Sequence, residues 1–193
     1  WESRLYWNRT VGMRSLGALT VFTTREERKA NAGTLQLSLP SRNVSLAGRF
    51  TYGYDDRYFA EFNFGYNGSE RFSSEHRWGF FPSVGLGWLV SNEKFFQPLT
   101  NVISKLKLRA SYGLVGNDKI GGSKNRFLYL SEMLMNNTGV KSYFGENLQT
   151  SSNGITFKRY ANSAITWERA KKQNYAIELS LFGDLDIIAE YYR

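Results

Sequence analysis

Few residues in this chain have the types and spacing that covalent chemistry requires. His76 is the single histidine and cysteine is absent, so neither a His–Cys zinc site nor a Cys–His nucleophile can form. The carboxylates Asp55 and Asp56 stand beside Arg57 between two apolar runs, which is typical of a polar turn rather than of an acid–base pair. The glycine-rich segment 113–122 lacks the Gly-Lys-Ser/Thr ending of a phosphate-binding loop. We therefore predict no enzymatic activity, no metal and no cofactor.

Residues suited to ligand binding are concentrated in the segment 115–167. Aromatic rings can stack on a sugar or a peptide, and side-chain amides can form hydrogen bonds with either. The candidates for substrate binding are Tyr129, Asn136, Asn137, Tyr143, Phe144, Asn147 and Tyr160. An equally good interpretation is that these side chains pack against other loops or against a protein that covers them.

The charge of the chain is strongly positive, at +8 with a pI of about 9.7, which raises the question of nucleic-acid binding. The 25 Lys and Arg residues are nevertheless scattered and form no basic run or recognition-helix pattern. We expect a solvated distribution without a nucleic-acid partner. Anionic lipopolysaccharide could also use part of this charge.

Apolar and polar residues alternate with a period of two along much of the chain, which predicts β-strands. The clearest hairpin joins segments 46–54 and 58–66, where Phe50 and Tyr52 share one face while Arg49 and Thr51 share the other. Eight such strands are expected, near residues 5–11, 16–23, 46–54, 58–66, 82–90, 106–114, 174–181 and 185–191. Five polar residues on them are candidates to face a wet interior: Arg49, Glu61, Asn63, Lys107 and Arg109.

The connections between these strands alternate between two length classes. Short connections lie near 12–15, 55–57 and 183–184, with a medium one at 91–104, whereas long ones cover about 24–45, 67–77 and 115–167. Short periplasmic turns opposite long extracellular loops are typical of an outer-membrane barrel, and 16% of the residues are aromatic, with several near strand ends. No run of 18 apolar residues occurs, so a transmembrane helix is excluded. The sequence thus predicts an all-β, transmembrane antiparallel β-barrel; the alternative is a soluble sandwich or barrel.

Several motifs follow one another in a recognisable order: YNGSERF at 66–72, RWGFFPS at 77–83, LKLRASYG at 106–113, GN at 116–117 and ITWE at 165–168, followed by KKQN. This series resembles the SusC/RagA-like family of TonB-linked outer-membrane proteins of Bacteroidetes. The resemblance is continuous from about residue 46 to residue 193 and looser before that.

The resemblance implies a barrel of 22 strands around an N-terminal plug domain, covered by a SusD-like surface lipoprotein and driven by the inner-membrane TonB complex. Residues 1–193 would then be part of the barrel domain, about eight strands of its wall, with cuts at Trp1 and Arg193. The five polar strand residues would face the lumen, where they could line the passage or bind the plug, and we favour contact with the plug. The rest of the transporter would supply the plug, the TonB contact and the remaining strands.

Three functions fit these observations. The leading hypothesis is energy-coupled import of oligosaccharides or peptides through the bacterial outer membrane. The alternatives are a small structural or adhesive outer-membrane barrel without transport, and a soluble carbohydrate-binding β-domain. The substrate itself cannot be named from the sequence, because loops, plug and lid together would determine it.

Overall fold

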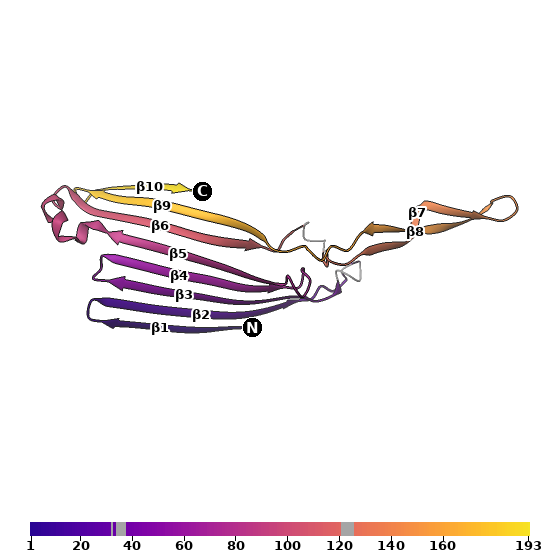
Figure 1. The fold of residues 1–193 in the computed structure, drawn as a ribbon, viewed down its shortest axis with the longest axis horizontal. Coiled ribbons are helices and arrows are strands. Elements are labelled where there is room, and N and C mark those ends of the chain that lie inside the picture. Colours follow the sequence, from indigo (N-terminus) through magenta and orange to yellow (C-terminus); the bar gives the residue numbers. More distant parts are fainter. Residues whose placement is uncertain (32, 34–37, 121–125) are drawn as a thin grey trace.

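The computed structural model describes residues 1–31, 33, 38–120 and 126–193, and strands dominate it (Figure 1). Two short 3-10 helices, η1 (Val90–Asn92) and η2 (Lys94–Leu99), form the connection after the fifth strand. Among the described residues, no helix is long and apolar enough to cross a membrane. The strands are β1 (Glu2–Val11), β2 (Arg14–Glu27), β3 (Ser41–Tyr54), β4 (Tyr58–Ser69), β5 (Trp78–Leu89), β6 (Ile103–Asn117), β7 (Glu132–Phe144), β8 (Thr150–Arg159), β9 (Glu168–Leu181) and β10 (Leu185–Tyr192).

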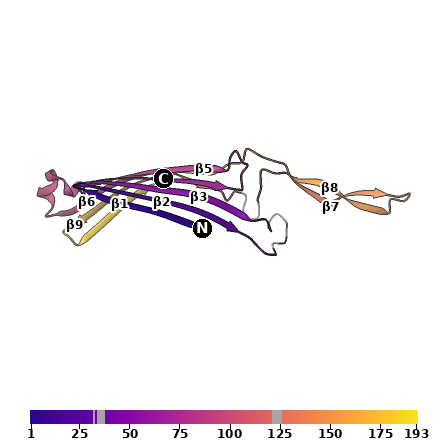
Figure 2. The ribbon, with the colours of Figure 1, turned by 90° about the horizontal axis from the view of Figure 1, so that it is seen from below.

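Eight of these strands form one antiparallel sheet in the order β1-β2-β3-β4-β5-β6-β9-β10. Neighbours in the sheet are also neighbours in the chain, except where β6 pairs directly with β9 across the segment that contains β7 and β8. The sheet is strongly twisted, so that β9 and β10 run at a wide angle to β1 and β2 (Figure 2). The eight expected strands and the antiparallel, all-β fold class are confirmed, although the sheet is open rather than closed into a barrel.

The two faces of the sheet differ in polarity because the side-chain period is two. Register places Phe50 opposite Phe62, Phe62 opposite Val84, and Val84 opposite Tyr112 on one face, where all four side chains are exposed. We call this the apolar face. The opposite face, which we call the polar face, carries the register pair Arg49 and Asn63. It also carries Arg109 of β6.

Turns and loops are separated between the two ends of the sheet (Figure 1). The β1–β2, β3–β4 and β9–β10 turns and the β5–β6 connection lie at one end, here named the short-turn end. The segments 28–40, 70–77 and 118–167 lie at the other, the long-loop end. This separation is the pattern that the alternating connection lengths predicted.

Strands reach further into the long connections than the sequence indicated. The expected loop 24–45 shortens to 28–40, because β2 and β3 remain paired out to Glu27 and Ser41, and the expected loop 67–77 shortens to 70–77. The expectation of a long loop over 115–167 is corrected by strands β7 and β8, which form a separate hairpin beyond the sheet (Figure 1). Residues 32, 34–37 and 121–125 of these ranges lie outside the described part of the chain.

Aromatic rings at the short-turn end meet a shared carboxylate. Tyr58 stacks on Trp88 with ring centroids 6.3 Å apart. The Tyr58 hydroxyl donates to Oε1 of Glu93 at 2.6 Å, and Nε1 of Trp88 donates to the same oxygen at 3.2 Å. Arg57 adds an ion pair with Glu93 at 3.5 Å. We call Tyr58, Trp88, Glu93 and Arg57 the rim cluster; it holds the polar tips of the rings at the edge of the apolar face, as an interfacial girdle requires.

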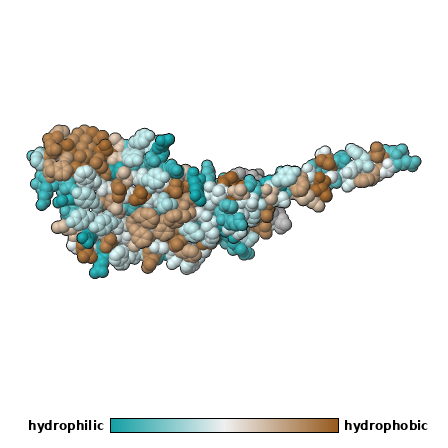
Figure 3. All heavy atoms as spheres, in the orientation of Figure 1, coloured by the Kyte–Doolittle hydropathy of each residue, from teal (hydrophilic) through white to brown (hydrophobic). Residues whose placement is uncertain are grey.

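Hydrophobic residues extend past the rim cluster onto the connections themselves. Figure 3 shows them gathered at the short-turn end, over the 3-10 helices and the β9–β10 turn. Phe95, Leu99, Val102 and Phe182 are all exposed there, and the backbone N–H of Phe182 donates to the carbonyl of Val102 at 2.9 Å. The two connections therefore form one apolar surface.

The rim cluster predicts a pH dependence of stability. Hydrogen bonds from Tyr58 and then Trp88, together with the charge of Arg57, hold the pKa of Glu93 below its usual range, although partial burial opposes them. Because the lowered pKa belongs to the folded state, this stabilisation is present above the ordinary carboxylate pKa and is lost as the pH falls through the lowered value. Glu93→Gln should lower the melting temperature at pH 7, and the difference from the wild type should shrink as the pH falls below the ordinary carboxylate pKa. Melting curves of the wild type and the variant over a range of pH test this prediction. Glu146→Gln, in the exposed β7–β8 turn, is the control. An unchanged melting temperature of Glu93→Gln at pH 7 would contradict the prediction.

A buried cluster at the long-loop end consists of Phe72, Phe81 and Trp167, which are 1%, 8% and 7% exposed. The Trp167 ring packs against Phe72 and Phe81 with centroids 5.3 and 5.2 Å away. Paired residues of β5 and β6 end at Ser83 and Gly113, and Phe81 lies two residues beyond this pair. These three rings, the aromatic cluster, join the 70–77 and 118–167 segments to the sheet.

Gly116 leaves the space that the Phe81 ring occupies. A Cβ on residue 116 would lie 2.0 Å from Cζ of Phe81, so Gly116→Ala must displace a ring that packs against Trp167. We expect a loss of about 1–3 kcal/mol in unfolding free energy, the usual effect of overpacking. The loss of stability is measured by the temperature at which the heat-modifiable gel mobility changes from that of the folded to that of the unfolded protein. Gly85→Ala is the matched control, since its Cβ would meet only Cβ of Glu61 at 3.9 Å; equal stability of both variants would contradict the assigned packing.

Candidate functional site: the polar face and the long-loop end

Three polar candidates from β3 and β4 form a linked group on the polar face. Arg49 and Asn63 are register partners, and Nε of Arg49 donates to Oδ1 of Asn63 at 3.0 Å. The amide nitrogen of Asn63 donates in turn to Oε1 of Glu61 at 2.6 Å, while Nε of Arg49 lies 3.8 Å from the same carboxylate oxygen. All three side chains retain exposed polar atoms. The group can therefore still bind a partner above the sheet.

A second group on β6, β9 and β10 contains the other two candidates. Arg109 bridges two carboxylates, with Nε 2.8 Å from Glu178 and Nη2 2.8 Å from Glu190. Lys105 also pairs with Glu178, at 2.9 Å. Lys107 lies over the Phe59 ring, 5.7 Å from its centroid. Arg109, Lys105 and Glu190 are all more than 40% exposed, whereas Glu178 is 16% exposed. Because one partner of each pair is open to solvent, each stabilises the fold by about 0–1 kcal/mol.

Glycines on β5 leave room between the two groups. Gly85 and Gly87 lie on the polar face, opposite Ser111 and Arg109 of β6. They help to line a hollow of about 500 Å³ that also takes in Glu61, Lys107 and Arg109. A neighbouring hollow of about 560 Å³ is lined by residues including Glu61, Asn63, Ser111, Lys172 and Asn174. Four of the five predicted polar-face residues thus line adjoining hollows, and Arg49 is bonded to two of those four.

The seven loop candidates do not converge on one site. Tyr143 and Phe144 end strand β7, and Asn147 lies in the turn of the hairpin, whereas Tyr129 and Tyr160 lie at its base. Thirteen residues of β7 separate the base from the turn, a span of roughly 40 Å. No single small ligand can contact both ends.

Several of these side chains make contacts within the hairpin and its base, one of them between the two strands. Asn153 donates to Asn136 at 2.5 Å, and Oδ1 of Asn137 accepts from the backbone N–H of Gly139 at 2.9 Å. Tyr160 stacks on Phe157 with centroids 5.0 Å apart, and Tyr129 lies edge-on to Phe127 at 6.2 Å. Four of the seven candidates therefore have contacts inside their own segment.

A basic pair fixes the base of the hairpin. Lys158 donates to Glu132 at 2.8 Å, and Arg159 lies 3.7 Å from the same carboxylate. The hydrogen bond from Lys158 holds the pKa of Glu132 below its usual range, with partial burial opposing it and the charge of Arg159 adding to it. These pairs join β7 to β8 at the base of the hairpin, and its turn is the exposed end.

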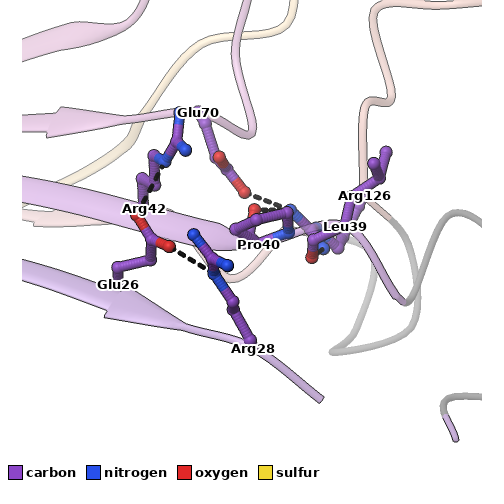
Figure 4. Close-up of polar contacts among 7 residues, drawn as sticks. All are labelled: Glu26, Arg28, Leu39, Pro40, Arg42, Glu70 and Arg126. Carbon is purple, nitrogen blue, oxygen red and sulfur yellow. Dashed lines mark hydrogen bonds and ion pairs between the residues drawn. The ribbon is translucent and has the colours of Figure 1, made fainter. Parts of the chain in front are cut away.

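Arg126 is a structural residue that the sequence analysis did not find. Its guanidinium, only 8% exposed, donates to the carbonyl oxygens of Leu39 at 2.5 Å and Pro40 at 2.7 Å and forms a short ion pair with Glu70 (Figure 4). The same group lies over the Phe127 ring at 4.9 Å. Arg126 therefore clamps the three long connections to one another. Nothing in the sequence around residue 126 marks it, since two of its partners are backbone carbonyls.

Two further contacts support the long-loop end. Ser69 donates to Asp118 at 2.8 Å, and Nε1 of Trp167 donates to the carbonyl of Arg77 at 3.2 Å. His76 hydrogen-bonds Ser73 at 3.2 Å, within its own loop. Over residues 1–31, 33, 38–120 and 126–193, no group of three His, Cys, Asp or Glu side chains could hold a metal ion.

The twisted sheet, its apolar and polar faces and its separated loops define a section of outer-membrane β-barrel wall. Its solved structural neighbours include the RagAB peptide importer in the "closed-closed" state (TM-score 0.74, 22% identity, 99% of this chain, 22% of that one) and in the "open-open" state (TM-score 0.66, 21% identity, with the same coverage). No family model matches the chain.

Curated relatives carry the sequence relationship. The chain is 35% identical over 153 residues to the TonB-dependent receptor SusC of Bacteroides thetaiotaomicron, covering 78% of this chain and 14% of that protein. It is 36% identical over 138 residues to the TonB-dependent receptor P39 of Formosa agariphila, covering 72% of this chain and 12% of that protein. The chain belongs to the SusC/RagA-like family of TonB-dependent outer-membrane receptors, as its motifs indicated. It spans about a seventh of the length of the SusC protein.

The Arg126 clamp generates a stability prediction. Arg126→Ala leaves the Glu70 carboxylate and two carbonyl oxygens without these donors, a loss of about 1–3 kcal/mol. We expect faster proteolysis within segments 28–40 and 118–131 and a lower melting temperature. Arg28→Ala is the matched control, because Arg28 pairs with Glu26 in an exposed position and its loss should change stability by less than about 0.5 kcal/mol (Figure 4). Identical proteolysis of the two variants would contradict the clamp.

Proposed function

We propose that this chain forms part of the barrel wall of a TonB-dependent importer that takes up oligosaccharides or peptides through the outer membrane. The observation that carries the proposal is the polar face, whose hollows combine glycines with exposed charged and amide groups. A small closed barrel would fill its interior with packed side chains. A wide lumen instead needs a wetted, hydrogen-bonding lining that a plug or a cargo can contact.

The polar-face residues suit contact with a plug domain more than recognition of one substrate. The Arg49–Asn63–Glu61 group and the Arg109–Glu178–Glu190 group present charges of both signs, separated by glycine-lined hollows. Mixed charges of this kind complement a folded protein surface and fix its register. We therefore assign Arg49, Glu61, Asn63, Lys107 and Arg109 to contact with the plug.

The β7–β8 hairpin suits contact with a SusD-like lipoprotein that covers the lumen. It extends past the sheet at the long-loop end, and Tyr143, Phe144 and Leu148 near its turn are more than half exposed. Exposed aromatic residues at the end of an anchored projection favour a protein partner. Tyr129 and Tyr160, at the base, remain candidates for contact with cargo.

The transport hypothesis is tested by uptake in whole cells. The receptor, in the outer membrane of its own species, should take up labelled oligosaccharides or labelled peptides, and uptake should disappear when the TonB protein is deleted while surface binding of the label remains. Uptake that persists without TonB would contradict energy coupling. Cells that bind the label but never import it would favour the adhesive barrel instead.

Charge reversal on the polar face separates plug contact from wall stability. Arg109→Glu places a third carboxylate beside Glu178 and Glu190, and we expect uptake to fall about tenfold, equivalent to about 1.4 kcal/mol. Uptake rate and heat-modifiable mobility are measured together. Arg109→Lys, which keeps the charge, is the control and should retain most of the uptake. Normal uptake by Arg109→Glu would remove Arg109 from the proposed contact.

A further inference from the structure

The apolar face carries a hollow of about 910 Å³ at the short-turn end, larger than either hollow on the polar face. One cross-strand row of its lining contains Ala60, Leu86 and Ala110, which are successive register partners. Tyr52 and Tyr175 are the next register partners on either side of this row. Leu86 and the alanines on either side of it thus form a floor between two tyrosine rings.

A second row of the lining lies two residues closer to the short turns. Here Trp88 pairs with Leu108, Leu108 with Ile177, and Ile177 with Ala189. Tyr58, the register partner of Trp88, completes the row. This row includes the two rings of the rim cluster, so the hollow is bounded at the short-turn end by groups whose polar tips are hydrogen-bonded.

The hollow follows from sheet geometry and from residue size. A strongly twisted sheet is saddle-shaped, so even the outer face of a barrel wall can be concave along one diagonal. Ala60, Ala110 and Ala189 deepen this concavity because each replaces a large side chain with a methyl group. Its volume lies within the range of small-molecule sites and its lining is apolar and aromatic, and it is an open, shallow hollow rather than an enclosed cavity.

We propose that this hollow is a specific binding site for the acyl chains of one phospholipid molecule. The receptor lies in the outer membrane, and the apolar face is the surface that meets lipid. The hollow adjoins the rim cluster and the short turns, which face the periplasm in outer-membrane barrels, so it lies in the periplasmic leaflet. That leaflet consists of phospholipids, whereas lipopolysaccharide occupies the other.

The site is tested by filling it. Ala110→Phe places a ring on the floor of the hollow, between Leu86 and Tyr175, and should reduce the phospholipid that remains bound by at least about fivefold, because the ring excludes the acyl chain. Native mass spectrometry of receptor extracted from outer membranes counts the bound lipid. Ala18→Phe is the matched control: residue 18 lies on the same face, opposite Phe50, outside the hollow.

Each outcome decides the proposal. One phospholipid retained by the wild type and by Ala18→Phe, but lost from Ala110→Phe, supports it. No retained lipid in the wild type, equal retention by both variants, retained lipopolysaccharide, or a dimer that dissociates in Ala110→Phe would overturn it. Heat-modifiable mobility verifies folding, and Ala110→Leu, which fills the hollow less, replaces Ala110→Phe if that variant does not fold. Uptake is not the readout, so the result is independent of the transport hypothesis.

Discussion

The ladder of backbone hydrogen bonds is the constraint on which the rest of this structure depends. Hydrocarbon offers no partner for a peptide N–H or C=O, so every strand that crosses it must pair on both sides. Within the sheet, strands β2 to β6 and β9 each have a paired strand on both sides, although the β5–β6 ladder ends at Ser83 and Gly113. The outer rows of β1 and β10 need further strands, whichever chain supplies them. The apolar face, the polar face and the two classes of connection are all arranged along that ladder.

Each end of the ladder is finished by a different kind of interaction. At the short-turn end, the rim cluster places one carboxylate beneath two ring tips, which suits a boundary between hydrocarbon and water. At the long-loop end, the aromatic cluster and the Arg126 clamp bury rings and a guanidinium above the sheet. The first fixes the depth of the wall in the membrane, and the second fixes the connections from which ligand contact would arise.

The strands and their faces could be predicted because apolar and polar residues alternate along the sequence, as at Phe50, Thr51 and Tyr52. Sequence reasoning underestimated strand length, because the polar run from Ser41 to Ser45 still pairs through its backbone. It missed the β7–β8 hairpin, whose repeated register shifts break the alternation. It found Phe72, Phe81 and Trp167 only as parts of motifs. Their convergence, like the contacts of Arg126, joins segments far apart in the chain and leaves no local pattern.

The direct pairing of β6 with β9 has a consequence for how such receptors can diversify. The wall closes beneath the segment 118–167 as though the segment were absent, from Ile103 opposite Leu181 to Asn117 opposite Glu168. Lengthening a loop that is already long raises the entropic cost of closing it only slightly, by about 0.6 kcal/mol for each doubling of its length. We therefore expect the β7–β8 hairpin, which lies beyond the sheet, to be exchangeable as a unit. Evolution or an engineer can replace it between fixed attachment points while the membrane-embedded scaffold keeps its register.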